Sequence, residues 1–117
     1  TYGGTPLGCR AALTVVNLIQ QGVSDNAAVM GARMISAFKE ALADLNIEVT
    51  GHGLMIGLHL PKPCAELVGI ARDKEKLLLN VTADSVVRLL PALIITAEEA
   101  DEIVQRVVRL VREFLSK

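Results

Sequence analysis

The feature that most constrains the fold is the apolar run from Val86 to Leu90, which an arginine interrupts and a proline follows. So short a run of β-branched and apolar residues predicts a buried strand. Arg88 cannot be buried inside it without a partner, because its charge would lose hydration. Two interpretations stay open. Either Arg88 turns to solvent or pairs with a nearby acid, or its planar guanidinium binds a carboxylate through two hydrogen bonds.

The N-terminal part of the chain predicts two successive helices. Thr5 suits the N-cap of the first helix, and Pro6 suits its first position, where a missing N–H costs nothing. The residues that follow are apolar on nearly every side, so we expect this helix to be buried on several faces or to run between two bodies of protein. Gly22 ends it. Ser24 then caps a second helix that continues to about Leu45.

The middle of the chain predicts a β-hairpin, because residues 47–50 and 54–60 alternate between apolar and polar on either side of a glycine-rich turn. We interpret His52 as a turn residue and His59 as an exposed strand residue, since a metal site would need further ligands at a recognisable spacing. Gly57 inside the second strand predicts a bulge or a close approach by another backbone.

The C-terminal half predicts a short helix over about 64–73, strands over 77–79 and 85–90, and a last helix that Thr96 and Glu99 begin with a capping box. The order of elements is then α-α-β-β-α-β-β-α. Such an order predicts an α+β fold in which helices cover one side of a small, mostly antiparallel sheet.

Composition narrows the class of protein. Of the 117 residues 51% are hydrophobic, and the net charge of −1 gives no electrostatic reason to expect nucleic acid or an anionic membrane as a partner. No stretch is long and apolar enough to cross a bilayer, so we expect the apolar excess to lie against another domain or subunit. We interpret Cys9 and Cys64 as reduced thiols of a cytoplasmic protein, with Cys9 packed in a helix.

The chain carries no familiar catalytic motif, since no glycine-rich phosphate loop, nucleophile elbow or cysteine–histidine pair appears. It begins instead with turn-forming residues and without an initiator methionine, so we expect a fragment of a longer protein. Three motifs are informative together, namely residues 1–9 (TYGGTPLGC), 51–57 (GHGLMIG) and 80–82 with 87–91 (NVT and VRLLP). In this order and spacing they resemble the C-terminal part of class-III pyridoxal-phosphate aminotransferases. Two departures are Thr5 and Ala92, where the family usually has Asn and a second Pro.

The resemblance covers essentially all 117 residues and implies a fold and a site. The intact enzyme would be a fold-type-I homodimer, with residues 1–117 as its C-terminal small domain and leading interdomain helix, and with the large cofactor-binding domain absent. Thr1 would contact the phosphate of pyridoxal phosphate in the neighbouring subunit, and Arg88 would bind a carboxylate of glutamate or 2-oxoglutarate. The lysine that forms the Schiff base lies upstream in the family, so no catalytic residue is expected here and the chain alone should be inactive. The lysines that fail to match it are Lys39, Lys62, Lys74, Lys76 and Lys117.

Within the family, residues 80–82 and the two leucines after Arg88 are most similar to members that move the δ-amino group of N-acetylornithine to 2-oxoglutarate in arginine biosynthesis. Ornithine, succinylornithine and 4-aminobutyrate remain alternative amino donors. An alternative of another class is a non-catalytic module that binds amino acids or a protein partner. Such a module would have no use for a phosphate-binding loop at Thr1, which favours the enzyme.

Overall fold

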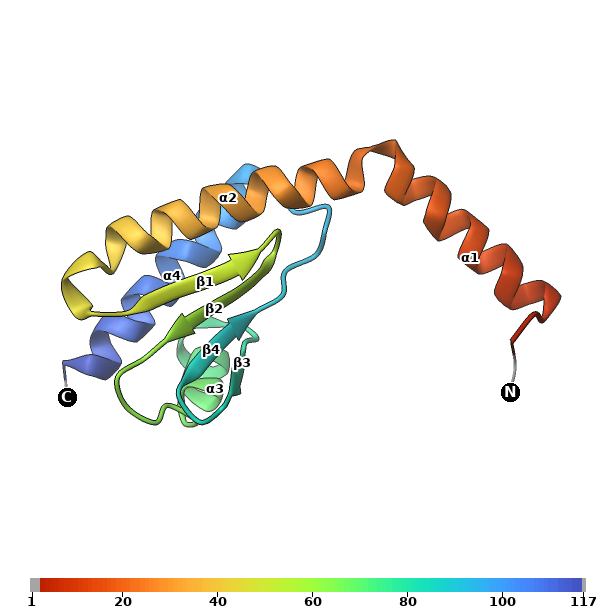
Figure 1. Ribbon diagram of the computed structural model, residues 1–117. Coiled ribbons are helices and arrows are strands. Elements are labelled where there is room, and N and C mark those ends of the chain that lie inside the picture. Colours follow the sequence, from red (N-terminus) through yellow and green to blue (C-terminus); the bar gives the residue numbers. More distant parts are fainter. Residues whose placement is uncertain (1–2, 117) are drawn as a thin grey trace.

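The computed structural model describes residues 3–116, and its elements follow the predicted order. Helices and a small antiparallel sheet form one body, from which the first helix projects (Figure 1). The fold is therefore the expected α+β arrangement. The helices are α1 (Pro6–Leu18), α2 (Ser24–Ala41), α3 (Leu67–Ile70) and α4 (Ala97–Leu115), and the strands are β1 (Glu48–His52), β2 (Met55–His59), β3 (Asn80–Thr82) and β4 (Val86–Leu89).

The sheet has four strands in the order β1-β2-β4-β3, and every neighbouring pair is antiparallel. The hairpin turn is tighter than predicted, because β1 extends through His52 and β2 starts at Met55. Gly53 in this turn has φ +53°, a conformation that costs glycine little. Gly57 forms no bulge: it pairs regularly with Thr50 and Arg88, and side chains rather than another backbone lie closest to it.

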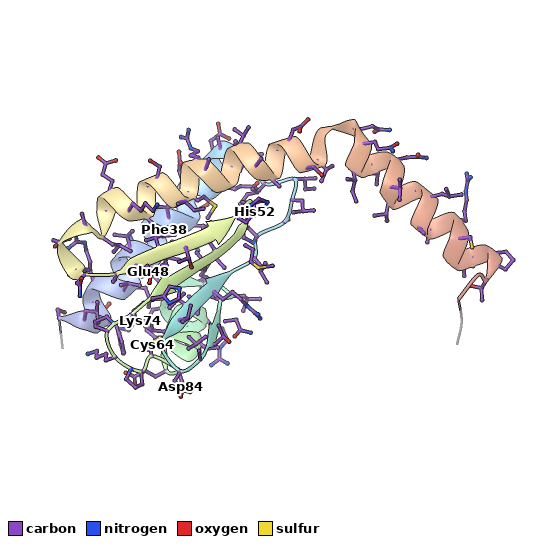
Figure 2. The ribbon with its side chains drawn as sticks, in the orientation of Figure 1. Phe38, Glu48, His52, Cys64, Lys74 and Asp84 are labelled. Carbon is purple, nitrogen blue, oxygen red and sulfur yellow. The ribbon has the colours of Figure 1, made fainter. Side chains whose placement is uncertain are left out.

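The core lies between the sheet and the helices α2 and α4, which cover one of its faces (Figure 1). Strand alternation sends every second side chain into this layer, and the amphipathic stripe of α4 meets them. Figure 2 shows Phe38 and Cys64 within the body of the domain. The largest fully buried side chains are Met34, Phe38, Leu42, Ile56, Leu58, Leu67, Val87, Leu110, Val107, Val111 and Cys64.

The last helix begins as predicted. The Thr96 hydroxyl accepts from the Glu99 backbone N–H at 3.3 Å, and a Glu99 carboxylate oxygen accepts from the Thr96 N–H at 2.9 Å. Both donors are among those that a helix start leaves without an intrahelical partner. The capping box therefore sets where the segment after β4 turns into α4.

The predicted strand over 77–79 is wrong, because the third strand comprises Asn80–Thr82 instead. Asn80 pairs with Arg88, and in this register Leu78 would face Leu90. Leu79 would likewise face Leu89, but the pairing of β3 with β4 ends at Asn80 and Arg88. Pro91, which would face Leu77, has no N–H to donate to a further pair.

The first helix departs most from expectation. Thr5 accepts from the Gly8 N–H at 3.3 Å, as a cap should, but every residue of α1 is exposed within this chain. The expectation that this helix is buried on several faces is therefore wrong within this chain. The expectation that Cys9 is packed is also wrong, because Cys9 is exposed. A run between two bodies of protein is the interpretation that stays open. Gly22, with φ +101°, separates α1 from α2 as predicted.

The second helix differs from the prediction at both ends. Ser24 is its first residue rather than its cap, since the chain passes from the kink into α2 without leaving helical geometry at Val23. The α-helix ends at Ala41, and a 3₁₀ turn continues to Leu45 before Asn46 adopts a left-handed conformation. Across residues 3–116, no helix is both long and apolar enough to span a membrane.

Candidate functional site

Arg88 lies on the face of the sheet that the helices leave open. Its neighbours Val87 and Leu89 point into the core, so strand alternation directs Arg88 the other way, where it is exposed. Within residues 3–116 its side chain has neither a hydrogen bond nor an ion pair. Within the described part of the chain Arg88 therefore turns to solvent and does not pair with a nearby acid. Its exposed guanidinium is accessible to an anion, so the second interpretation stays open.

Arg88 belongs to a row of residues that crosses the whole sheet. Thr50 of β1 pairs with Gly57 of β2, which pairs with Arg88 of β4, which pairs with Asn80 of β3. Gly57 contributes no side chain of its own, and the side chains of Thr50, Val86 and His59 lie close to the position its Cβ would take. Asn80 lies directly opposite on the other side, and its side chain also has no hydrogen bond among residues 3–116. Asn80 was part of a sequence motif, but only strand pairing identifies it as a neighbour of Arg88.

A shallow depression of about 220 Å³ lies beside Arg88 and Asn80. A guanidinium and an amide supply charged and neutral donors, and leucines supply the remaining wall. Such a mixture suits a carboxylate carried on a short aliphatic chain. The lining residues are Leu78, Leu79, Asn80, Arg88 and Leu90.

The two histidines take no part in this depression. His59 is half-buried rather than exposed, and its Nε2 lies 3.0 Å from the Thr50 hydroxyl oxygen. His52 is the last residue of β1 rather than a turn residue, and Figure 2 shows it at the turn end of the hairpin. In the described part of the chain, no three histidine, cysteine, aspartate or glutamate side chains lie close enough to hold a metal ion.

Two larger hollows flank the segment that follows β4. One of about 600 Å³ lies between this segment and α4, and another of about 590 Å³ lies between the segment, α2 and the hairpin. Acidic side chains of the first are already engaged, Glu99 in the capping box and Glu102 with Arg106. The amide of Asn26 holds the segment in place, donating to the carbonyl oxygens of Leu93 at 2.8 Å and Ile95 at 3.1 Å. Nothing in the sequence pattern identified Asn26, because its partners lie far along the chain.

The charge cluster over 72–76 is mostly a solvated surface, as its alternating signs predict, but the side chain of Glu75 is only 11% exposed. Arg72 pairs with Asp73, and Glu75 with Arg109; both acids have pKa values lowered chiefly by hydrogen bonds from these arginines. Cys64 is different, since burial raises the pKa of its thiol and so disfavours a nucleophilic thiolate.

The described residues do not by themselves form a site for pyridoxal phosphate. Thr1, the residue expected at its phosphate, lies outside residues 3–116. No lysine lines the depression beside Arg88. Lys62 lies over the Phe114 ring at 4.5 Å, Lys74 donates to Glu113 at 2.7 Å, and Lys76 donates to a backbone carbonyl. What the depression offers is the guanidinium of Arg88 and the amide of Asn80, which have no partner among residues 3–116.

Comparison with known proteins assigns the class. Residues 1–111 match the model of the family described as aminotransferase class-III, and the chain belongs to this family. The similar curated relatives include the acetylornithine aminotransferase 1 of Bordetella parapertussis, 47% identical over 100% of this chain and 30% of that protein. The acetylornithine aminotransferase of Nitrosomonas europaea is 46% identical over 98% of this chain and 30% of that protein. The chain thus spans about 30% of the length of these relatives.

Solved structures agree on the fold. The acetylornithine aminotransferase of Elizabethkingia anophelis superposes with a TM-score of 0.85 at 26% identity, covering 97% of this chain and 30% of that one. The ornithine δ-aminotransferase of Plasmodium falciparum gives a TM-score of 0.82 at 33% identity, with the same coverage of 97% and 30%. The four-stranded sheet and its helices are therefore those of class-III aminotransferases.

Proposed function

We propose that the chain is the C-terminal small domain, with its leading interdomain helix, of an enzyme that transfers the δ-amino group of N-acetylornithine to 2-oxoglutarate in arginine biosynthesis. The identity of 46–47% to acetylornithine aminotransferases over nearly the whole chain supports this assignment. The structural observation that carries it is Arg88, an exposed arginine without a partner in residues 3–116, beside a depression of suitable chemistry.

In this proposal Arg88 binds a carboxylate of 2-oxoglutarate or glutamate. A guanidinium presents its N–H groups in a planar fork that matches the two carboxylate oxygens, which lysine cannot do. Arg88 is exposed on the open sheet face, which leaves the fork accessible, and its pairing partner Gly57 on β2 has no side chain. Thr1 would contact the phosphate of pyridoxal phosphate across the interface of a cytoplasmic homodimer.

The remaining chemistry belongs to the rest of the enzyme. Pyridoxal phosphate, when bound, supplies the electron sink for amino-group transfer. The lysine that holds it and the acid beside its pyridine nitrogen would come from the large domain, so the present chain alone is inactive. The exposed apolar side chains of α1, such as Leu7 at 82% exposure, support a place for this helix between the two domains.

The test is the substitution Arg88→Ala in the complete enzyme with its cofactor. Loss of a bidentate charged contact costs about 2–4 kcal/mol, so kcat/KM for 2-oxoglutarate should fall roughly 30- to 1000-fold while cofactor absorbance is unchanged. Arg88→Lys keeps the positive charge but lacks the planar fork, so its kcat/KM for 2-oxoglutarate should lie between those of the wild type and Arg88→Ala. If Arg88→Ala left kcat/KM for 2-oxoglutarate unchanged, Arg88 would not bind the substrate and would be only a solvent-exposed surface residue.

The amino donor needs its own comparison. Ornithine aminotransferases are among the similar structures, so ornithine is the specific alternative donor. Initial rates with N-acetylornithine, succinylornithine, ornithine and 4-aminobutyrate at fixed 2-oxoglutarate should be highest with N-acetylornithine. Absence of transamination with all four would favour the non-catalytic binding module.

A further inference from the structure

We infer that Asn80 is a second binding residue for the carboxylate that Arg88 holds, with its side-chain amide donating to one carboxylate oxygen. This inference rests on the proposed function and extends it to a residue outside the arginine motif. It also places the aliphatic part of the acid against the leucines beside Asn80.

The first support is the pairing of the two strands. Asn80 and Arg88 are direct partners in the antiparallel β3–β4 ladder, so their side chains leave the same face of the sheet. Directly opposite residues have Cβ atoms about 4.5–5.5 Å apart. An anion held at the guanidinium can therefore also be reached from the opposite strand. Both side chains are exposed, and neither has a hydrogen-bond partner within residues 3–116.

The second support is hydrogen-bonding capacity. A carboxylate accepts about four hydrogen bonds, and a bidentate arginine uses only two of these positions. The amide of Asn80 supplies a further donor for one of the remaining positions without adding a second positive charge. Gly57 separates the Thr50 hydroxyl from Arg88, and Thr50 lies against His59. The Thr82 hydroxyl is on the same face as Asn80 but lies opposite Val86 rather than Arg88.

The third support is the apolar wall. Leu78, Leu79 and Leu90 line the same depression as Arg88 and Asn80, and Leu78 is 86% exposed in this chain. Leucines at a charged site are suited to the methylene groups that separate the two carboxylates of a dicarboxylic acid. The depression thus selects an acid with a short aliphatic chain over a small inorganic anion.

The experiment compares three variants of the complete enzyme with bound cofactor. Asn80→Ala removes the amide. Asn80→Asp replaces the amide donor with a carboxylate of the same shape, whose negative charge repels the carboxylate of the substrate. Thr82→Ala is the matched control on the same strand and face. We expect KM for 2-oxoglutarate to rise about tenfold in Asn80→Ala, the effect of one hydrogen bond to a charged group. Asn80→Asp should raise it further. KM for the amino donor and the melting temperature should change little, and Thr82→Ala should match the wild type.

The outcomes separate this inference from the proposed function. If Asn80→Ala keeps the wild-type KM while Arg88→Ala loses activity, the role of Asn80 is refuted and the proposed function stands. Equal rises in both KM values together with a lower melting temperature would assign Asn80 to the fold and also refute its role. If the wild-type enzyme does not use 2-oxoglutarate at all, the proposed function fails and the inference fails with it.

Discussion

The contact between Gly31 of α2 and Gly53 of the hairpin turn predicts a sharp loss of stability in Gly31→Ala. A Cβ on Gly31 would overlap the carbonyl carbon and oxygen of Gly53 and would lie 2.8 Å from its Cα. These atoms belong to the backbone, so no side chain can rotate to make room. Either α2 or the turn must move away from the core.

The expected change in the free energy of unfolding of Gly31→Ala follows from two opposing effects. Alanine in place of glycine favours a helix by about 1 kcal/mol. Overpacking a close contact costs about 1–3 kcal/mol, and here the cost lies at or beyond the upper limit because rigid backbone is displaced. We therefore expect a net loss of about 2 kcal/mol, which corresponds to a melting temperature lower by roughly 8 °C for a domain of this size.

Thermal unfolding followed by far-ultraviolet circular dichroism is the assay. Gly69→Ala in α3 is the matched control, because a Cβ there meets nothing within 4 Å. Gly69→Ala should unfold at or slightly above the wild-type temperature. A Gly31→Ala protein that is as stable as Gly69→Ala would refute the argument, since it would mean that helix and turn are not in contact.

Three further predictions concern the turn after β3, the surface ion pairs and α1. Ala83 has φ +47°, so Ala83→Gly should raise the free energy of unfolding by about 0.5–1 kcal/mol in urea titrations, and an unchanged midpoint would contradict this. Hydrogen bonds from Arg33 lower the pKa of Asp101 in the folded state; this pair therefore stabilises the protein above the unfolded pKa of about 3.9 and loses its effect as pH falls through the lower folded value. Asp101→Asn should reduce the dependence of melting temperature on pH between about 5 and 2, and an identical dependence would exclude the pair as a cause. Residues 6–20 expose apolar side chains whose burial is worth several kcal/mol, so this chain should self-associate at micromolar concentration in sedimentation experiments, whereas Leu13→Glu should weaken association.

Local patterns in the sequence determined much of the secondary structure. Alternation predicted the hairpin and the burial of Leu54, Ile56, Leu58 and Leu60, because strand geometry sends every second side chain to one face. The capping box at Thr96 was predictable because its partners lie three residues apart. The resemblance of three motifs was also sufficient to predict the family, which the comparisons confirm.

Only the tertiary structure decided features that depend on partners distant in the chain. Residues 77–79 have the composition of a strand, but the pairing of β3 with β4 ends at Asn80 and Arg88. The close approach of Gly31 to Gly53 and the two hydrogen bonds from Asn26 likewise join segments that local propensity treats separately.

At the candidate site, too, some features follow from the sequence and others only from the tertiary structure. The sequence determined that Arg88 is an arginine inside an apolar strand, and burial of its neighbours then required it to face away from the core. Strand register, which depends on pairing across the sheet, placed Asn80 opposite Arg88 and Gly57 on its other side. The grouping of Arg88, Asn80 and Gly57 on one face therefore exists only in the folded sheet.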